Sequence, residues 1–397
     1  MNEESSIGIG IVGSGFLAET RARCYAKAGA GGRIVAVASR TIEGARAWAE
    51  HHGVPAAFDD LAALLALDEV DVVDLCVPNL LHRPMAEAAA RAGKHVVCTK
   101  PLAAYVGQDL AEDVEDAAVS ARGRREMMEV AVADAQAMVD AADEAGVQLM
   151  YGENWVYAPS ITRASDLLQA AGGALLEMRG WESHSGSHSP YSKVWRNTGG
   201  GALLRLAAHP IGAMLHLKRE EGLERDGEPI VPVAVSAEVA DLSRVPGVAA
   251  GGTDLATGWE DVENWGCVIL SFSDGTRGVA YGSDNMLGGM ESKLELLGSR
   301  CHLKCNLSPN DLLRAFTPDG GVFGDEYVME KLDSGAGWTT PIPDEDYGSG
   351  HIAMCADFLR AVSEGRPALA DGGLGLDVTR VVYAAYASAE EGSRIDL

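Results

Sequence analysis

The sequence predicts an α/β fold class, with a doubly wound parallel sheet first and an α+β domain with a large, mostly antiparallel open sheet after it. Three observations predict this. An apolar run near the start passes into a glycine-rich stretch, and strand-like and helix-like segments then alternate. From about residue 174, strand-like segments separated by Gly- and Asp-rich turns take over. Because 397 residues are too many for one compact core, we expect two domains, 1–152 and 153–397.

The first stretch, residues 7–18 (IGIGIVGSGFLA), predicts a buried strand that turns sharply into a helix. It contains the G-x-G-x-x-A form of the dinucleotide-binding pattern. Gly13 would permit the tight turn, Gly15 would let a pyrophosphate approach the backbone, and Ala18 would keep the helix close to the sheet. The unpaired N–H groups at the helix start would bind the anion, although a plain glycine turn is the alternative. The cofactor-binding residues expected here are Gly13, Gly15, Phe16 and Leu17.

The remaining elements follow from hydrophobic periodicity and from turn residues. In the first domain we expect strands at 33–39, 70–78, 94–98 and 147–151, and helices at 42–52, 60–66 (capped by Asp59) and about 84–93. Residues 108–145 predict two helices. In the second domain we expect strands at 174–183, 231–239, 262–273, 276–283 and 291–297, a surface loop at 245–258, and helices at 201–217, 350–364 and 374–391.

Composition narrows the classes of protein. A formal net charge of -26 argues against nucleic acid as a partner, because phosphate binding needs a basic surface. No apolar run reaches the roughly 20 residues of a membrane helix, and no secretory signal precedes the first strand. The seven cysteines form no C-x-x-C pair, which favours reduced thiols in the cytoplasm.

The end of the second strand predicts which nicotinamide cofactor is preferred. Ser39 and Arg40 stand where an acidic residue would hold the ribose 2′-hydroxyl of NAD. A hydroxyl and a guanidinium suit a 2′-phosphate better, so we expect NADP, with NAD possible. The alternative is that Arg40 only solvates the end of the strand.

Several segments together resemble the family named after glucose–fructose oxidoreductase, inositol dehydrogenase and a rhizopine-catabolism protein (Gfo/Idh/MocA). They are GSGFLA at 13–18, CVPN at 76–79 with His82, AGKHVVCTKPL at 92–102, Trp195-Arg196, GGGALL at 199–204 with His209, and residues 358–365 and 384–392. The resemblance covers most of the chain, but an extra helical segment at about 105–130 is foreign to it. It implies an N-terminal Rossmann domain, a C-terminal domain whose open sheet packs in homodimers or homotetramers, and hydride transfer between a nicotinamide and a polyol.

The resemblance also implies roles for individual residues. Lys100 matches the catalytic lysine of the family's Glu-Lys-Pro motif and also lies against cofactor and substrate, while His209 matches the histidine base. Pro101 would hold the lysine turn, with a cis peptide as one option. Asn154 falls where the family places a substrate contact. The further cofactor-contacting positions implied are Pro78, Asn79, His82, Pro101, Trp195 and Arg196.

At three positions the sequence lacks an acidic residue that the family uses for proton transfer. Thr99 replaces the glutamate beside the lysine, Gly212 replaces an acid, and Arg205 replaces an aspartate four residues before His209. On a helix Arg205 would share a face with His209 and would need an anion, since an unpaired buried charge is costly. That anion is either a neighbouring carboxylate, such as Glu153 or Glu182, or a substrate carboxylate.

His184 and His188 have a spacing seen in metal sites, but they lie in a Ser/Gly stretch with no clear third ligand. We therefore expect His188 to contact substrate and expect no metal.

The function predicted is an NAD(P)-dependent oxidoreductase acting on a sugar, sugar acid or cyclitol, cytoplasmic, with no membrane partner. One alternative is redox-assisted elimination, deglycosylation or epimerisation with a tightly held cofactor. The other is a non-catalytic sensor of cofactor or sugar.

Overall fold

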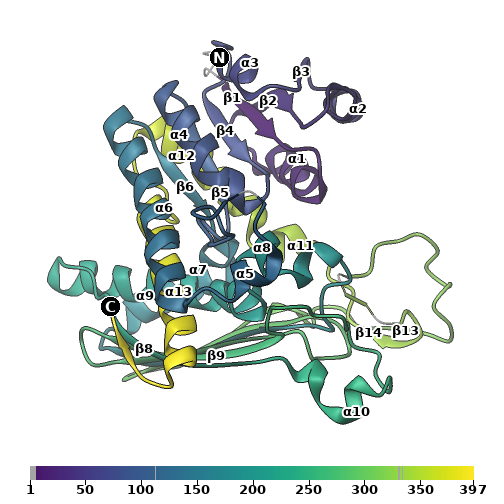
Figure 1. Ribbon diagram of the computed structural model, residues 1–397, viewed down its shortest axis with the longest axis vertical. Helices are drawn as coiled ribbons and strands as arrows, with labels where there is room; N and C mark the ends of the chain where they lie inside the picture. The colour runs from purple at the N-terminus through teal and green to yellow at the C-terminus, as the bar shows by residue number, and fades with distance from the viewer. Residues whose placement is uncertain (1–5, 112, 330, 333) are drawn as a thin grey trace. The chain divides into compact units, whose positions relative to one another are not determined.

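The computed structural model describes residues 6–111, 113–329, 331–332 and 334–397, which fall into two compact units (Figure 1). The first unit comprises residues 1–104, 131–157 and 350–379, and the second comprises 105–130, 158–349 and 380–397. By packing, residues 350–379 therefore belong with the N-terminal sheet and residues 105–130 with the C-terminal sheet. A single boundary after residue 152 would instead place residues 105–130 in the first domain and residues 350–379 in the second. The expected division into 1–152 and 153–397 stays a prediction.

The first unit is built on a six-stranded parallel sheet, as the sequence predicts. Its strands in spatial order are β3 (Ala56–Phe58), β2 (Gly32–Ala38), β1 (Ile7–Val12), β4 (Val72–Leu75), β5 (His95–Thr99) and β6 (Leu149–Gly152). Every residue of β1, β4 and β6 is buried, which is why these segments read as apolar runs without alternation. The sequence missed β3, whose three residues are too few to show a pattern.

Helices pack around this sheet: α1 (Phe16–Ala28), α2 (Ile42–His52), α3 (Leu61–Leu65), α4 (His82–Arg91), much of α6 (Arg124–Ala145), α12 (His351–Glu364) and the start of α13 (Gly372–Glu391). Thr41 caps α2 by accepting the Gly44 N–H. The cap expected for α3 was Asp59, and this is wrong by one residue: the Asp60 side chain accepts the Ala62 N–H, so Asp60 stands outside the helix.

The second unit contains a seven-stranded sheet, mostly antiparallel as expected. In spatial order its strands are β12 (His302–Ser308), β11 (Glu291–Gly298), β7 (Leu175–Ser183), β10 (Arg277–Ser283), β9 (Trp265–Phe272), β8 (Pro232–Ala240) and β15 (Ile395–Asp396). Only the β7–β10 pair is parallel.

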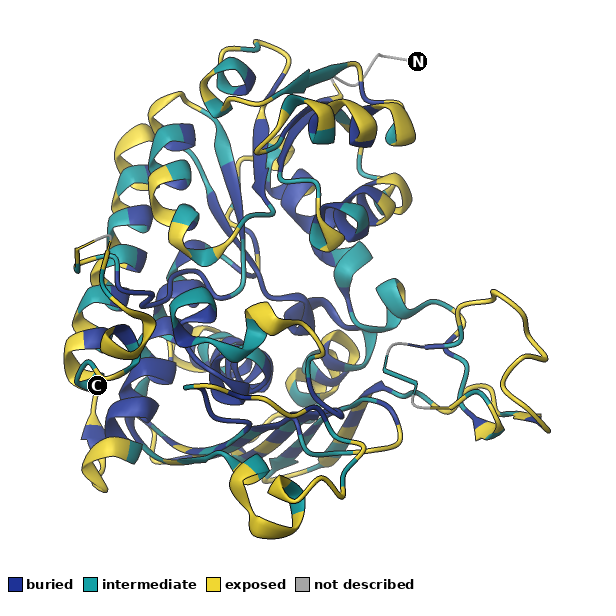
Figure 2. Cartoon of the chain, turned by 45° about the vertical axis from the view of Figure 1, so that its right-hand side comes forward, coloured by how far each residue is buried: buried dark blue, intermediate teal, exposed yellow. Residues whose placement is uncertain are grey.

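Helices of the second unit are α5 (Asp116–Ser120), α7 (Pro159–Ala171), α8 (Trp195–Thr198), α9 (Ala208–Asp226), α10 (Pro246–Ala249) and α11 (Glu345–Gly348). The long helices α7 and α9 contact one another and the sheet. A separate hairpin joins β13 (Ala315–Thr317) to β14 (Gly337–Thr339), and the loop that carries it is largely exposed in Figure 2, whereas the strands of the first sheet are mostly buried. Single helical turns are η1 (Asn79–Leu81), η2 (Asn154–Tyr157), η3 (Pro190–Lys193), η4 (Leu203–Ala207) and η5 (Leu242–Arg244).

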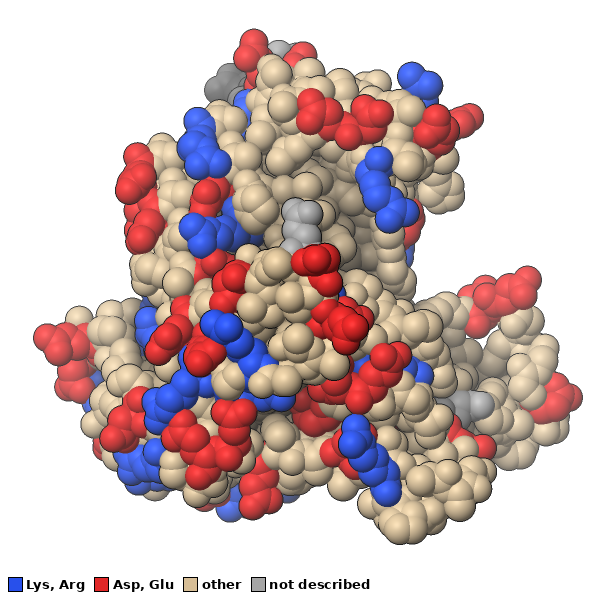
Figure 3. Space-filling view, in the orientation of Figure 1, with Lys and Arg blue, Asp and Glu red and all other residues tan. Residues whose placement is uncertain are grey.

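Charged side chains of both signs are interspersed over the face shown in Figure 3. Within the described part of the chain, none of the helices has the length and apolar character that crossing a bilayer requires.

A buried ion pair lies at the centre of the first unit. Arg21 of α1 is 1% exposed, and its Nε lies 3.2 Å from Oδ2 of Asp74 in β4, which is 0% exposed. The Tyr25 hydroxyl donates to the same oxygen at 2.9 Å. Asp74 therefore has the partners that a buried carboxylate needs, and the pair fixes α1 against the sheet.

Replacing Arg21 by methionine should lower the free energy of unfolding by about 3–5 kcal/mol, because Asp74 is left buried without its cation. The double variant Arg21→Met/Asp74→Leu should lose less than Arg21→Met alone. Urea unfolding followed by circular dichroism measures both. The control is Arg83→Met, which removes surface pairs with Glu87 and Asp134 and should cost about 0–1 kcal/mol. If Arg21→Met costs no more than this control, the buried pair does not stabilise the unit.

Candidate active site

The turn from β1 to α1 has the geometry that a pyrophosphate needs. Gly13 has φ 114°, and a Cβ there would lie 2.2 Å from the carbonyl oxygen of Cys76, so only glycine fits. Gly15 begins α1 with no side-chain cap, and a Cβ on it would meet no other atom within 4 Å. The first N–H groups of α1 thus face open space, which fits a nicotinamide dinucleotide. Phe16, the first helical residue, is 78% exposed, and Leu17 follows it half-buried.

The end of β2 contributes hydroxyl groups beside this turn. Ser39 Oγ lies 2.8 Å from Ser14 Oγ, and Arg40 is exposed. A Cβ on Gly44 would lie 3.1 Å from Thr41 Oγ1 and 3.7 Å from Ser39 Oγ, so these hydroxyls gather at the start of α2.

The Lys100 turn follows β5 and is held by a histidine. The Lys100–Pro101 peptide is cis, the option left open by the sequence. His82 is fully buried, with Nδ1 3.1 Å from the Pro101 oxygen and Nε2 3.1 Å from the Val77 oxygen. Burial lowers the pKa of His82, and the carbonyls around its ring oppose this shift. Both ring nitrogens face carbonyls, so the residue positions two loops, and the cofactor contact expected of His82 stays a prediction.

Glu153 lies beside Lys100 because of strand register. Thr99 of β5 pairs with Gly152 of β6, so Lys100 and Glu153 are the next residues of two neighbouring parallel strands. Glu153 is 0% exposed, and its Oε1 accepts the Trp155 N–H at 3.1 Å. Burial raises the pKa of Glu153 to about 8, against the opposing effect of the Lys100 charge. A carboxyl group that exchanges protons near neutral pH thus lies next to the lysine, although Thr99 is not an acid.

The sequence missed this role for Glu153, which it named only as a partner for Arg205. Because Thr99 stands where the family carries a glutamate, no acid adjoins Lys100 in the sequence. The acid beside Lys100 is Glu153, which follows β6. The signal that could have found it is an acid directly after a second buried strand. The predicted residues of the first unit do come together: each follows the carboxyl end of a strand of one parallel sheet, where such folds bind ligands. They are Gly13 and Gly15, Ser39 and Arg40, Pro78 and Asn79, Lys100 and Pro101, and Asn154.

In the second unit, Glu263 holds the start of the helical stretch that leads to His209. A Cβ on Gly201 would lie 1.8 Å from the Glu263 carbonyl oxygen, so the glycine permits close approach. The Glu263 carboxylate accepts the N–H groups of Gly201 at 3.1 Å and Leu203 at 2.9 Å. The chain then forms the π-helical turn η4 and continues as α9, whose second residue is His209, 7% exposed. The single helix expected at 201–217 is therefore a π-turn followed by a longer helix.

Arg205, inside η4, contacts a carboxylate that the sequence did not indicate. Its Nη2 contacts Oδ2 of Asp284, which is 0% exposed, and its Cζ lies 5.2 Å from the Trp259 ring centroid. The carboxylate expected was Glu153 or Glu182; the one that the described contacts show is Asp284, just after β10. Burial raises the pKa of Asp284 and the Arg205 charge opposes this. Because Asp284 compensates the guanidinium, a substrate carboxylate is not required, and that role for Arg205 stays a prediction.

His184 lies close to the same carboxylate, with Nδ1 3.6 Å from Asp284 Oδ1. The Gly186 N–H donates to this nitrogen at 2.9 Å, so Nδ1 is an acceptor and the neutral ring carries its proton on Nε2. His188, further along the same loop, is exposed. Its expected contact with substrate stays a prediction.

The segment 105–130 packs on Trp195 and Arg196. Trp195 is 1% exposed and donates its indole N–H to the Tyr105 oxygen at 3.0 Å, while Arg124 lies 4.0 Å above its ring. The Arg196 Nε lies 2.6 Å from Asp116 Oδ1. The expected cofactor contacts of this pair stay predictions, since its polar atoms already bind this segment.

Comparison with known proteins identifies the family. The description "Oxidoreductase family, NAD-binding Rossmann fold" applies to residues 7–131, and the GFO/IDH/MocA C-terminal domain matches residues 163–304. The chain belongs to the Gfo/Idh/MocA family. It is an NAD(P)-dependent oxidoreductase, so the predicted family, fold class and enzymatic class are confirmed.

Individual relatives agree with this over nearly the whole chain. Levoglucosan dehydrogenase of Pseudarthrobacter phenanthrenivorans is 26% identical over 398 residues, covering 92% of this chain and 93% of that protein. Myo-inositol 2-dehydrogenase of Thermotoga maritima is 23% identical, covering 88% and 86%. Among solved structures, GenD2 from gentamicin A biosynthesis, in complex with NAD, has a TM-score of 0.77 and 25% identity, covering 98% of this chain and 96% of that one. Levoglucosan dehydrogenase with NADH and L-sorbose has a TM-score of 0.70 at 21% identity, covering 98% of each chain, and shares the fold.

The raised pKa of Glu153 predicts a pH dependence of the stability of this Gfo/Idh/MocA protein. Between its usual pKa of 4.5 and the folded value of about 8, the unfolded chain releases the proton that the folded chain keeps. The destabilising contribution of Glu153 is therefore absent below pH 4.5, grows as the pH rises, and is complete above pH 8.

In urea unfolding at a series of pH values from about 5 to 8, Glu153→Gln should gain stability relative to the wild type as the pH rises. The exposed control Glu50→Gln should follow the wild type. A constant difference between Glu153→Gln and the wild type across this range would show that Glu153 does not hold a proton in the folded protein.

Proposed function

We propose that this oxidoreductase transfers a hydride between a nicotinamide cofactor and a CH–OH or keto group of a sugar, sugar acid or cyclitol, with Lys100 and His209 as its catalytic residues. The observation that carries the proposal is the Lys100–Glu153 pair, which lies at the same carboxyl edge of the first sheet as the glycine turn. The substrate class is supported by relatives named levoglucosan dehydrogenase, myo-inositol 2-dehydrogenase and 1,5-anhydro-D-fructose reductase.

Each residue has a defined task in this reaction. A bound nicotinamide dinucleotide would supply the hydride acceptor, and the turn of Gly13 and Gly15 would hold its pyrophosphate. The Lys100 ammonium stabilises negative charge on the substrate oxygen as the C–H bond weakens. The His209 imidazole takes the hydroxyl proton, which suits its ordinary pKa range. Glu153, buried beside Lys100, interacts with its charge, and the ionised carboxylate favours the ammonium form that this role requires.

Lys100→Ala should lower kcat by about a hundredfold or more, the effect of losing one charge-stabilising or proton-transferring group. Turnover is followed by the absorbance of reduced nicotinamide over a panel of sugars, sugar acids and cyclitols. Cofactor affinity and the unfolding midpoint should stay close to wild type. Near-wild-type activity of Lys100→Ala would contradict the proposal, and product formation without net change in nicotinamide would indicate transient redox instead.

We propose further that NADP is the preferred cofactor. Ser39, Arg40 and the neighbouring hydroxyls of Ser14 and Thr41 offer donors and one positive charge at the end of β2, where NAD-specific proteins of this fold carry an acid. Arginine suits a phosphate group because its planar fork can donate two parallel hydrogen bonds.

Calorimetry with NADP and NAD tests this preference. Arg40→Ala should weaken NADP more than NAD, because only NADP has a 2′-phosphate for Arg40 to bind. Gly15→Asp should weaken both strongly, since it adds a negative charge beside the pyrophosphate. Equal losses for both cofactors in Arg40→Ala would remove the 2′-phosphate role, and tighter binding of NAD by the wild type would overturn the preference.

We also propose that the protein works in the cytoplasm as a homodimer or homotetramer that pairs through the open face of the second sheet. Apolar side chains on that face support this assembly. Trp181 and Tyr281 stack with ring centroids 5.9 Å apart and an interplanar angle of 5°, and Ile269 is 48% exposed. A half-buried aromatic pair beside an exposed isoleucine is an apolar patch that a second copy of the chain could cover.

A further inference from the structure

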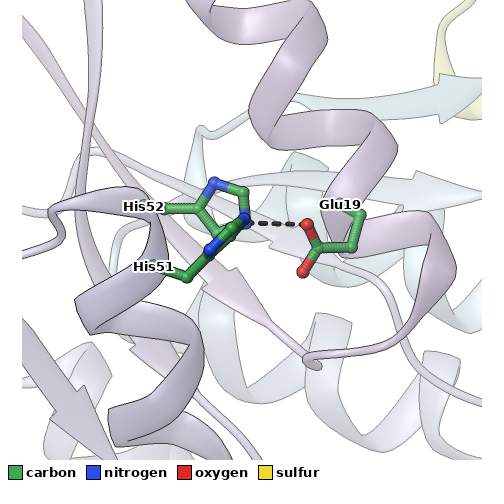
Figure 4. A group of neighbouring side chains, drawn as sticks. All are labelled: Glu19, His51 and His52. Atoms are coloured by element: carbon green, nitrogen blue, oxygen red, sulfur yellow. Dashed lines mark hydrogen bonds and ion pairs between the residues drawn. The ribbon is translucent and has the colours of Figure 1, made fainter. Parts of the chain in front are cut away.

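Three side chains that have no role in the proposed hydride transfer point toward one another between α1 and α2 of the first unit. They are Glu19, in the first turn of α1, and His51 and His52, the last two residues of α2 (Figure 4). One ring nitrogen of each histidine and one carboxylate oxygen of Glu19 all lie within 4.8 Å of one another. His52 Nε2 and Glu19 Oε2 are 2.8 Å apart.

Local packing orients these side chains. The His52 ring centroid lies 4.2 Å from that of Trp48, one turn earlier in α2, so the ring is held between Trp48 and Glu19. His51 lies edge-on to His52, with centroids 4.7 Å apart. Gly53, with φ 67°, ends α2 directly after the two histidines.

An ordinary ion pair explains only part of this arrangement. A hydrogen bond between His52 and Glu19 needs no third group, yet the exposed His51 directs a ring nitrogen toward the same point. Two imidazole nitrogens and one carboxylate oxygen are the donor set of three-ligand zinc sites, and imidazole suits Zn²⁺, Cu²⁺ and Ni²⁺ far better than Mg²⁺ or Ca²⁺. The negative end of the α2 dipole lies at His51 and His52, and it adds attraction for a cation.

We propose that Glu19, His51 and His52 bind one divalent transition-metal ion of the zinc type, with water completing its coordination. Metal–ligand bonds of about 2.0–2.2 Å place tetrahedral donor atoms about 3.3 Å apart. The Glu19–His52 pair therefore opens slightly from 2.8 Å, and the exposed His51 side chain moves closer to both. The ion braces the end of α2 against the start of α1, one turn from Gly15. It is structural, so the hydride transfer does not require it.

Zinc binding to the full-length protein tests the site directly. Protein treated with EDTA and then dialysed is titrated with Zn²⁺ in competition with a chromophoric chelator. The wild type should bind one tight equivalent, and Glu19→Gln, His51→Gln and His52→Gln should each weaken it by about tenfold or more, the scale of losses from altered zinc sites. His302→Gln, which alters an exposed histidine on β12, is the matched control and should bind as the wild type does.

Two further measurements keep the test decisive. Co²⁺ should give the visible absorption of a tetrahedral site in the wild type and lose it in Glu19→Gln, a readout independent of activity. Circular dichroism checks folding; if His52→Gln unfolds because it loses its contact with Trp48, the half-buried Glu19 and exposed His51 variants decide. Zinc affinity unchanged in either of these, no tight equivalent in the wild type, equal affinity for Mg²⁺, or loss of the equivalent in His302→Gln would each overturn the proposal.

Discussion

The Arg21–Asp74 pair is the interaction on which the geometry of the first unit depends, because one guanidinium from α1 lies against three other elements. It projects from α1, whose first residues form the pyrophosphate turn, and pairs with β4. Its Nη1 lies 3.9 Å from the sulfur of Met354 in α12. A Cβ on Gly152, at the end of β6, would lie 2.8 Å from its Nη2. Glycine before Glu153 is thus required by Arg21, so the buried cation and the candidate proton carrier share one constraint.

In the sequence, two of the departures from the family pattern remove an acid near a candidate catalytic residue. In the structure, a carboxyl group from a distant segment lies near each of these positions. Thr99 leaves Lys100 without an adjacent glutamate, and Glu153 approaches from β6. Arg205 reverses the charge expected before His209, and Asp284, after β10, compensates it. In both cases the chemistry depends on contacts between segments that are distant in the sequence. Burial then raises the pKa of both carboxyl groups.

The difference between features specified by adjacent residues and features specified by distant segments explains what the sequence could predict. The glycine turn, the parallel strands and Lys100 are each specified by adjacent residues, through a positive φ at Gly13 or a continuous apolar run. Glu153 beside Lys100 and Asp284 beside Arg205 depend on pairings between distant segments, which no local pattern contains. His82 shows the intermediate case: the motif identifies the position, but only the structure shows its ring bonded to two loops.

The segment 105–130 changes what Trp195 and Arg196 can contribute. An indole has one N–H, and that of Trp195 is donated to Tyr105, whose own N–H is accepted by the Tyr383 hydroxyl. Arg124 covers the Trp195 ring, and Asp116 holds the Arg196 guanidinium. A cofactor contact by this pair would compete with these bonds inside the second unit. Trp195 and Arg196 therefore anchor the segment 105–130 within the second unit.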